Sequence, residues 1–455
     1  MFSTLLTHCD TLVTMNDAGE ELQNAALYAE DGVIAAIGPG EGLPQHADLV
    51  IDMRHHVVLP GLVNCHHHLY QNLTRVIPAA QDASLFGWLR ALYPLWAGLT
   101  PEAIRVSTTL GLVELLLSGC TTSSDHHYLF PRGCQLDDQI EAALALGVRF
   151  HAMRGSMSIG ESAGGLPPDQ VVEDESHILA DSQRLIERWH DPDRYALLRV
   201  GLAPCSPFSV SRDLMRASAE LARQYGVRLH THLAENAEDI RFCEQVYGMR
   251  PGDYAASCGW LGDDVWHAHC VHLDGHESAA FAETGTGVAH CPCSNMRLGS
   301  GIAPVRQWLD QGVRVGLGVD GSASNDGADL RAEARQALLL QRVQHGANRF
   351  TAREALSLAT RGGAAVLGRN DIGSLEVGKA CDVVAWRTDS IAFAGFDADP
   401  VAAITLGNPG HVNHALVQGR ARVCDGEPVD VDLPRLLQQH RRAAADLINA
   451  APVPG

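Results

Sequence analysis

The chain has 455 residues, 46% apolar and 19% charged, which is enough material for one large domain or two ordinary ones. Acidic residues outnumber basic ones 54 to 34, and the formal net charge is −20. A surface this negative repels phosphate backbones and anionic lipid headgroups, so we expect no nucleic-acid partner and no membrane partner.

The N-terminal residues lack the basic region and the small-residue cleavage site of a signal peptide, and no run of 18 apolar residues indicates a transmembrane helix. The 12 cysteines are scattered along the chain without a CxxC pair. This usage is typical of reduced thiols, and we expect a cytoplasmic protein.

Both ends of the chain are rich in short predicted strands. Residues 1–58 contain three such stretches, with Asp31 and Gly32 as a hairpin signal, and residues 369–428 have the same texture. We expect the two segments to pair into one small β-sandwich domain. Residues 429–455 form a predicted helical tail that packs on the outside.

Between these ends, residues 59–368 alternate short apolar runs with helical stretches. Eight runs are typical of buried parallel strands. They span 57–68, 120–127, 147–157, 196–206, 226–235, 264–273, 285–295 and 312–321. Eight strand–helix units predict an α/β fold, a (β/α)8 TIM barrel, with a doubly wound sheet as the competing architecture.

Histidines and carboxylates gather at the carboxyl ends of these runs, where a barrel places its functional side chains. His66 and His68 alternate along the first run, so they share one face and can bind one metal ion. Later runs end in His230 and His232 with Glu235, in His267 and His269, and in Asp320. A lone histidine in an apolar strand is more often a core residue, but suitable groups at four strand ends favour a metal site. Three imidazoles and a carboxylate suit zinc above all, with iron and manganese as alternatives.

Five sequence blocks resemble the signature blocks of the amidohydrolase superfamily, in the branch that deaminates nucleobases and S-adenosylhomocysteine and hydrolyses s-triazines. They are PGLVNCHHH at 60–68, HTHLAE at 230–235, HAHCVHL at 267–273, CPCSNMRLGSG at 291–301 and GLGVDG at 316–321. GSLEVGKACDVV at 373–384 is similar to the strand with which that family re-enters its small β domain.

The resemblance implies a metal-dependent hydrolytic deaminase that often assembles as a homo-oligomer. It makes His66, His68, His232 and Asp320 the metal ligands, and Glu235, His269 and Asp320 the acid–base groups. His230 is expected behind the ligands, with no partner identified. Two-metal members usually need a carboxylated lysine or an equivalent bridging carboxylate, and the single lysine here, Lys379, lies outside the fourth run. We therefore expect one divalent ion.

The segment 69–102 is expected to form a lid and resembles that of the 8-oxoguanine deaminases of this family. This implies the hydrolysis of 8-oxoguanine to urate and ammonia, with guanine, isoguanine or a hydroxylated s-triazine as alternative substrates. Gln71 is a candidate reader of the purine edge, because its amide offers both a donor and an acceptor. Arg154 is a second candidate, or pairs with a lid carboxylate, and Cys205 either touches the purine or packs. A metal-storage protein is a further alternative, but storage does not need Glu235 and Asp320.

Overall fold

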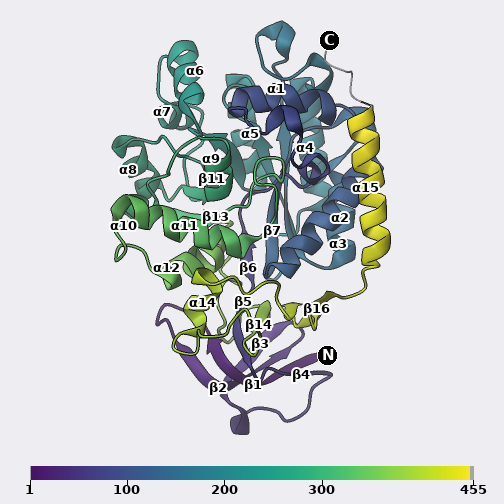
Figure 1. Cartoon of the computed structure of the whole chain (residues 1–455). Helices are drawn as coiled ribbons and strands as arrows, with labels where there is room; N and C mark the ends of the chain where they lie inside the picture. The colour runs from purple at the N-terminus through teal and green to yellow at the C-terminus, as the bar shows by residue number, and fades with distance from the viewer. Residues whose placement is uncertain (1, 451–455) are drawn as a thin grey trace.

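The computed structural model describes residues 2–450 and confirms the predicted barrel (Figure 1). Eight parallel strands close on themselves, and each lies within one of the predicted runs. The strands are β6 (Leu62–Asn64), β7 (Cys120–His127), β8 (Arg149–Ser156), β9 (Leu198–Pro204), β10 (Leu229–Leu233), β11 (Val265–His269), β12 (Gly287–His290) and β13 (Arg314–Leu317).

The first predicted run is divided between two sheets. Its first half is strand β5 (His56–Pro60), which pairs outside the barrel, and its second half is the barrel strand β6. The chain crosses at Gly61, where a Cβ atom would lie 1.9 Å from the Thr121 hydroxyl oxygen. Glycine therefore permits the close approach that takes the backbone from one sheet to the other.

The two chain ends form a sheet of nine strands below the barrel, which confirms the small β domain (Figure 1). β5 lies between strands from the two ends, pairing with β14 on one side and β1 on the other. Asp31 and Gly32 have φ values of 45° and 81° in the tight turn between β2 and β3, as the hairpin signal predicts. The other strands are β1 (Ser3–Val13), β2 (Glu21–Glu30), β3 (Val33–Pro39), β4 (Leu49–Asp52), β14 (Val383–Arg387), β15 (His414–Val417), β16 (Arg420–Cys424) and β17 (Glu427–Pro428).

Helices surround the barrel and bury their apolar faces against its strands, which is where the largest core lies. In α5, the Ser211 hydroxyl caps the first turn by accepting from the Leu214 amide at 3.0 Å, and Gly226 ends the helix at φ 67°. The helices are α1 (Leu85–Trp96), α2 (Pro101–Leu117), α3 (Leu136–Leu146), α4 (Glu175–Trp189), α5 (Arg212–Tyr225), α6 (Ala237–Tyr247), α7 (Pro251–Ser257), α8 (Gly275–Thr284), α9 (Pro292–Arg297), α10 (Val305–Gln311), α11 (Leu330–His345), α12 (Ala352–Ser357), α13 (Gly363–Val366), α14 (Pro400–Leu406) and α15 (Leu433–Asn449). Short 3-10 helices are η1 (Gly40–Gly42), η2 (Leu69–Thr74), η3 (Pro78–Ala80), η4 (Pro131–Gly133), η5 (Glu161–Ala163) and η6 (Asp169–Val171), and η7 (Leu358–Gly362) is a π-helix.

The C-terminal helix α15 lies against α2 on the outside of the barrel (Figure 1). The last predicted tail residues, 451–455, lie outside the described residues. None of the described helices is both long and apolar enough to cross a membrane.

Candidate active site

A cavity lies at the carboxyl ends of the barrel strands. Its walls combine the predicted polar groups with aromatic and aliphatic side chains of the segment that follows β6. The lining residues are His68, Gln71, Leu85, Trp88, Leu89, Tyr93, Tyr128, Cys205, Ser206, Phe208, His232, Glu235, His269, Leu298, Asp320 and Ser324.

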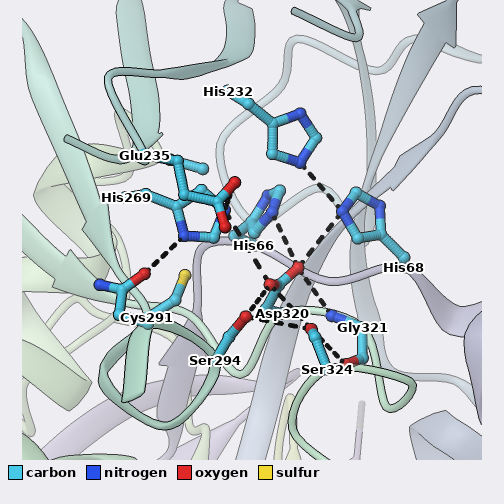
Figure 2. Close-up of polar contacts among 12 residues, drawn as sticks. His66, His68, His232, Glu235, His269, Cys291, Ser294, Asp320, Gly321 and Ser324 are labelled. Atoms are coloured by element: carbon cyan, nitrogen blue, oxygen red, sulfur yellow. Dashed lines mark hydrogen bonds and ion pairs between the residues drawn. The ribbon is translucent and has the colours of Figure 1, made fainter. Parts of the chain in front are cut away.

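The structure brings the four predicted metal ligands together (Figure 2). Asp320 Oδ1 lies 3.2 Å from His66 Nε2 and 3.3 Å from His68 Nε2. The Nε2 atoms of His68 and His232 lie 3.1 Å apart. β6, β10 and β13 carry or precede these residues, so distant parts of the chain meet at one point.

The hydrogen bonds behind these imidazoles leave lone pairs that face one another. His68 Nδ1 donates to the His126 carbonyl and His232 Nδ1 donates to the Cys205 carbonyl, each at 2.6 Å. Neutral rings with these tautomers have no proton on Nε2, so the 3.1 Å contact joins two acceptors. Burial lowers the pKa of His232 to about 3, which keeps that ring neutral. A divalent cation would satisfy both nitrogens, so the donor set fits a metal site.

The partner of His230 is the ligand His66. His66 Nδ1 lies 2.7 Å from His230 Nε2, and His230 Nδ1 donates to the Trp266 carbonyl at 3.0 Å. The His230 ring therefore accepts the Nδ1 proton of His66, and the His66 Nε2 lone pair is left facing Asp320. That buried Nε2 atom has no hydrogen-bond partner within residues 2–450. A hydrogen bond behind a ligating imidazole is the usual way that a protein sets its tautomer.

Two further histidines lie close enough to share an ion. One group of ligand atoms within 4.8 Å of one another comes from His66, His232, His269 and Asp320, and a second comes from His66, His68, His126 and His232. His126 is not among the ligands that the sequence predicted. The signal that could have identified it is its place at the end of β7, whose carboxyl end also faces the cavity.

Asp320 is held by groups that favour its ionised form. Ser294 donates to Oδ2 at 2.5 Å, Ser324 donates to Oδ2 at 3.1 Å, and the Gly321 amide donates to Oδ1 at 2.7 Å (Figure 2). Burial alone would raise the pKa of Asp320, and these three donors oppose that effect by stabilising the carboxylate. The backbone of Asp320 has φ 59°, in the left-handed region.

Glu235 is the contrasting carboxyl group. Burial, and then the charge of Asp320, raise the pKa of Glu235 to about 8. Glu235 Oε2 lies 3.6 Å from His269 Nε2, which lies 3.9 Å from Asp320 Oδ2. His269 Nδ1 donates to the Asn295 amide oxygen at 2.9 Å, so a neutral ring presents its Nε2 lone pair to the two carboxyl groups.

Two of the three candidate substrate contacts line the cavity. The Gln71 side chain is buried, and its Oε1 atom has no hydrogen-bond partner within residues 2–450. A Cβ atom on Gly321 would lie 1.8 Å from that oxygen, so the absence of a side chain there admits the Gln71 amide beside Asp320. Cys205 Sγ lies 3.9 Å from His232 Nδ1, and burial raises the pKa of the thiol to about 12.

The structure places Arg154 in an ion-pair cluster, outside the lining of the cavity. Its guanidinium donates to Glu173 at 2.8 Å and to Asp181 at 3.1 Å, and it lies over the Phe130 ring. Arg154 therefore pairs with carboxylates, but they come from α4 and the residues just before it, and the predicted partner in the lid is wrong.

The aromatic residues of the predicted lid divide between packing and the cavity wall. Trp88, Tyr93 and Trp96 are all buried residues of α1. Trp96 is fully buried, and its indole donates to Thr74 at 3.0 Å, whereas Trp88 and Tyr93 also reach the cavity. Helical spacing could not separate these outcomes, because all three residues lie on the buried part of α1.

Comparison with known proteins agrees with this geometry. The chain is 49% identical over 425 residues to the 8-oxoguanine deaminase of Pseudomonas aeruginosa strain PAO1, covering 93% of this chain and 94% of that protein. It is 36% identical to an isoxanthopterin deaminase from an unknown prokaryotic organism, over 89% of this chain and 88% of that protein.

A similar solved structure is the zinc complex of the atrazine chlorohydrolase of Arthrobacter aurescens TC1. It superposes with a TM-score of 0.92 at 35% identity, over 97% of this chain and all of the other. The model of the amidohydrolase family matches residues 57–422, and the chain therefore belongs to the amidohydrolase family.

Proposed function

We propose that this chain is a metal-dependent hydrolytic deaminase that converts 8-oxoguanine and water to urate and ammonia. The observation that carries the proposal is the 49% identity to an 8-oxoguanine deaminase, which extends over 93% of the chain. The buried acid–base groups beside the ligand cluster support the same reaction class.

His66, His68, His232 and Asp320 would hold a single divalent cation, which we propose to be zinc. The three imidazoles and one carboxylate are a usual zinc donor set, and the similar chlorohydrolase structure contains zinc. When bound, such an ion lowers the pKa of water from 15.7 to about 7 and so supplies hydroxide at neutral pH. The only lysine, Lys379, pairs with Glu376 in the segment that precedes β14, so no carboxylated lysine bridges a second ion.

The two carboxyl groups divide the proton transfers between them. Asp320 is ionised and accepts a proton from the attacking water. Glu235 carries a proton at neutral pH because its pKa is raised to about 8, so it can protonate the ring nitrogen next to the reacting carbon. The proton held on Asp320 then passes to the leaving amine. His269 lies between them, and its donation to the developing oxygen requires a second proton on its ring.

The cavity residues outside the metal and acid–base groups suit a flat ring with polar edges. Trp88, Leu89 and Phe208 line the cavity with apolar surface, and the Gln71 amide presents a free acceptor beside Asp320. An oxidised purine offers ring N–H and C=O groups to such an amide. We propose that Gln71 reads the edge of the purine next to the reacting carbon and that Cys205 lies against the ring.

A substrate panel with ammonia detection tests the proposal. The panel contains 8-oxoguanine, guanine, isoguanine, isoxanthopterin and a hydroxylated s-triazine, and Glu235→Gln protein is the negative control. We expect the highest kcat/KM for 8-oxoguanine. Faster release of ammonia from another member of the panel would reassign the substrate. The homo-oligomeric state and the cytoplasmic location stay predictions. Light scattering would measure the oligomeric state.

A further inference from the structure

Tyr93 is a polar residue of the cavity wall that the proposed mechanism does not use. It lies on α1, lines the cavity and is 1% exposed. Its hydroxyl has no hydrogen-bond partner within residues 2–450. Burial raises the pKa of Tyr93 well above its usual value, so the phenol keeps its proton and remains a donor.

The other polar aromatic groups of α1 are satisfied. Trp88 Nε1 donates to the Ala323 carbonyl at 3.1 Å, and Trp96 Nε1 donates to Thr74 at 3.0 Å. The Tyr93 ring packs edge-on against Trp96 at a centroid distance of 5.8 Å, a contact that phenylalanine would make equally well. A buried hydroxyl without a partner is destabilising, so this hydroxyl points to a ligand that supplies an acceptor.

The place of Tyr93 indicates which part of the ligand it meets. Gln71 lies beside Asp320 and therefore faces the reacting end of the substrate, as the close approach to Gly321 requires. Tyr93 instead belongs to the wall that α1 contributes with Leu85, Trp88 and Leu89. In 8-oxoguanine the amine that leaves is on C2 of the six-membered ring, and the oxygen on C8 is at the opposite end of the molecule.

We infer that Tyr93 is a specificity residue whose hydroxyl donates a hydrogen bond to the C8 oxygen of the substrate. This inference rests on the proposed deamination of 8-oxoguanine. Guanine carries only a C–H group at C8, so its binding leaves the Tyr93 hydroxyl without an acceptor. A site that is built to bond a substrate oxygen discriminates against the analogue that lacks it, because its own polar group is left unpaired.

The test compares Tyr93→Phe with the unchanged metal-loaded enzyme on 8-oxoguanine and guanine. We expect kcat/KM for 8-oxoguanine to fall by about 10- to 100-fold, the effect of one buried hydrogen bond to a substrate. The value for guanine should change much less. Inhibition constants of urate and xanthine give an independent readout, because only urate has the C8 oxygen, and the preference for urate should be lost.

Thermal unfolding separates this role from packing. Tyr254→Phe is the matched control, since the Tyr254 hydroxyl is also buried without a partner in the described chain and lies on α7, outside the cavity lining. Neither variant should lower the melting temperature, because each removes a buried hydroxyl that has no partner within residues 2–450. An equal fall for both substrates, no fall for 8-oxoguanine, or a loss of stability confined to Tyr93→Phe would overturn the inference. Absence of 8-oxoguanine turnover in the unchanged enzyme would instead refute the proposed function itself.

Discussion

The buried carboxyl groups of Asp320 and Glu235 lie on either side of the His269 imidazole. At neutral pH we expect Asp320 to be ionised and Glu235 to carry a proton. Asp320 faces imidazoles and hydroxyl donors, whereas Glu235 lies in a buried place where its strongest charged neighbour is Asp320 itself. Environments that push two pKa values apart assign one group as base and the other as acid. The sequence could predict both residues, because each follows a strand end, but their separate roles came from the family resemblance.

Replacing either proton-transfer group should abolish most of the activity without emptying the metal site. Glu235→Gln keeps the shape of the side chain, but an amide cannot act as a general acid near neutral pH. We therefore expect kcat to fall by about 10²–10⁴. Asp320→Asn should lose at least as much and hold metal less tightly. Steady-state kinetics beside metal analysis measures both effects. Near-normal turnover by Asp320→Asn would refute its assigned role.

The hydrogen bond from His66 to His230 should be visible in metal affinity. His230→Phe keeps a ring stacked on Trp266, whose centroid lies 4.6 Å from that of His230, but cannot accept the His66 proton. We expect metal to bind about 10- to 100-fold more weakly, the usual effect of losing such a partner. Competition with a chelator measures the affinity. His267→Phe is the control, because that imidazole bonds the Trp260 carbonyl instead, and an equal loss in both variants would contradict the assignment.

At the scale of elements, strand periodicity predicted which side chains share a face of a strand. It did not predict the partners that hold other side chains in place. Alternation placed His66 and His68 on one face because the period of a strand is two. The partners of Arg154 could not be predicted in the same way, since Glu173 precedes α4 and Asp181 lies within it, and their approach depends on how that helix packs. The division of the first run at Gly61 was not predicted either, although Pro60 and Gly61 interrupt the run at that point.

The C-terminal helix reaches the segment that carries Gln71. His440 Nε2, on α15, lies 2.8 Å from the Asn72 side-chain oxygen, and Asn72 also donates to the Ser107 carbonyl at 2.8 Å. α15 and α2 therefore hold η2 from behind. The sequence predicted an outer helix but gave no sign of this contact, which joins residues 368 positions apart.

Loss of the His440 contact should loosen substrate binding more than it slows chemistry. For His440→Ala we expect KM to rise by about three- to tenfold with a smaller change in kcat, as for one lost hydrogen bond. His440→Gln, which can still donate, should recover much of the loss in steady-state assays. Arg442→Ala changes an exposed residue of the same helix and should behave as the unchanged enzyme. A fall in kcat alone would argue against a positioning role.

At the scale of the whole molecule, one buried ion pair joins the barrel to the β domain. Arg149 of β8 donates to Asp382, which immediately precedes β14, with Nε 2.5 Å from Oδ2, and both side chains are buried. The Asp382 carboxylate also accepts from the backbone N–H of Gln418 at 2.9 Å. The barrel and the two-ended β domain were predictable from strand runs and turns, whereas this junction was not, because ion pairing across domains leaves no periodic signal.

Breaking this pair on one side should be costly. Arg149→Met leaves a buried carboxylate without its partner, and we expect the free energy of unfolding to fall by about 3–5 kcal/mol. Urea unfolding followed by circular dichroism measures the change. The double variant Arg149→Met, Asp382→Leu should lose less than the single one, because no charge is left buried. A double variant less stable than Arg149→Met would mean that the pair acts through packing.

The central claim is that one divalent ion, held by residues from three separate parts of the chain, is required for deamination. Metal content and turnover of 8-oxoguanine and guanine, measured in the same preparation before and after chelation, test it most directly. We predict a single ion per chain, activity that falls in proportion to metal removed and returns with added zinc, and a preference for 8-oxoguanine. Undiminished turnover by the metal-free chain would contradict the account.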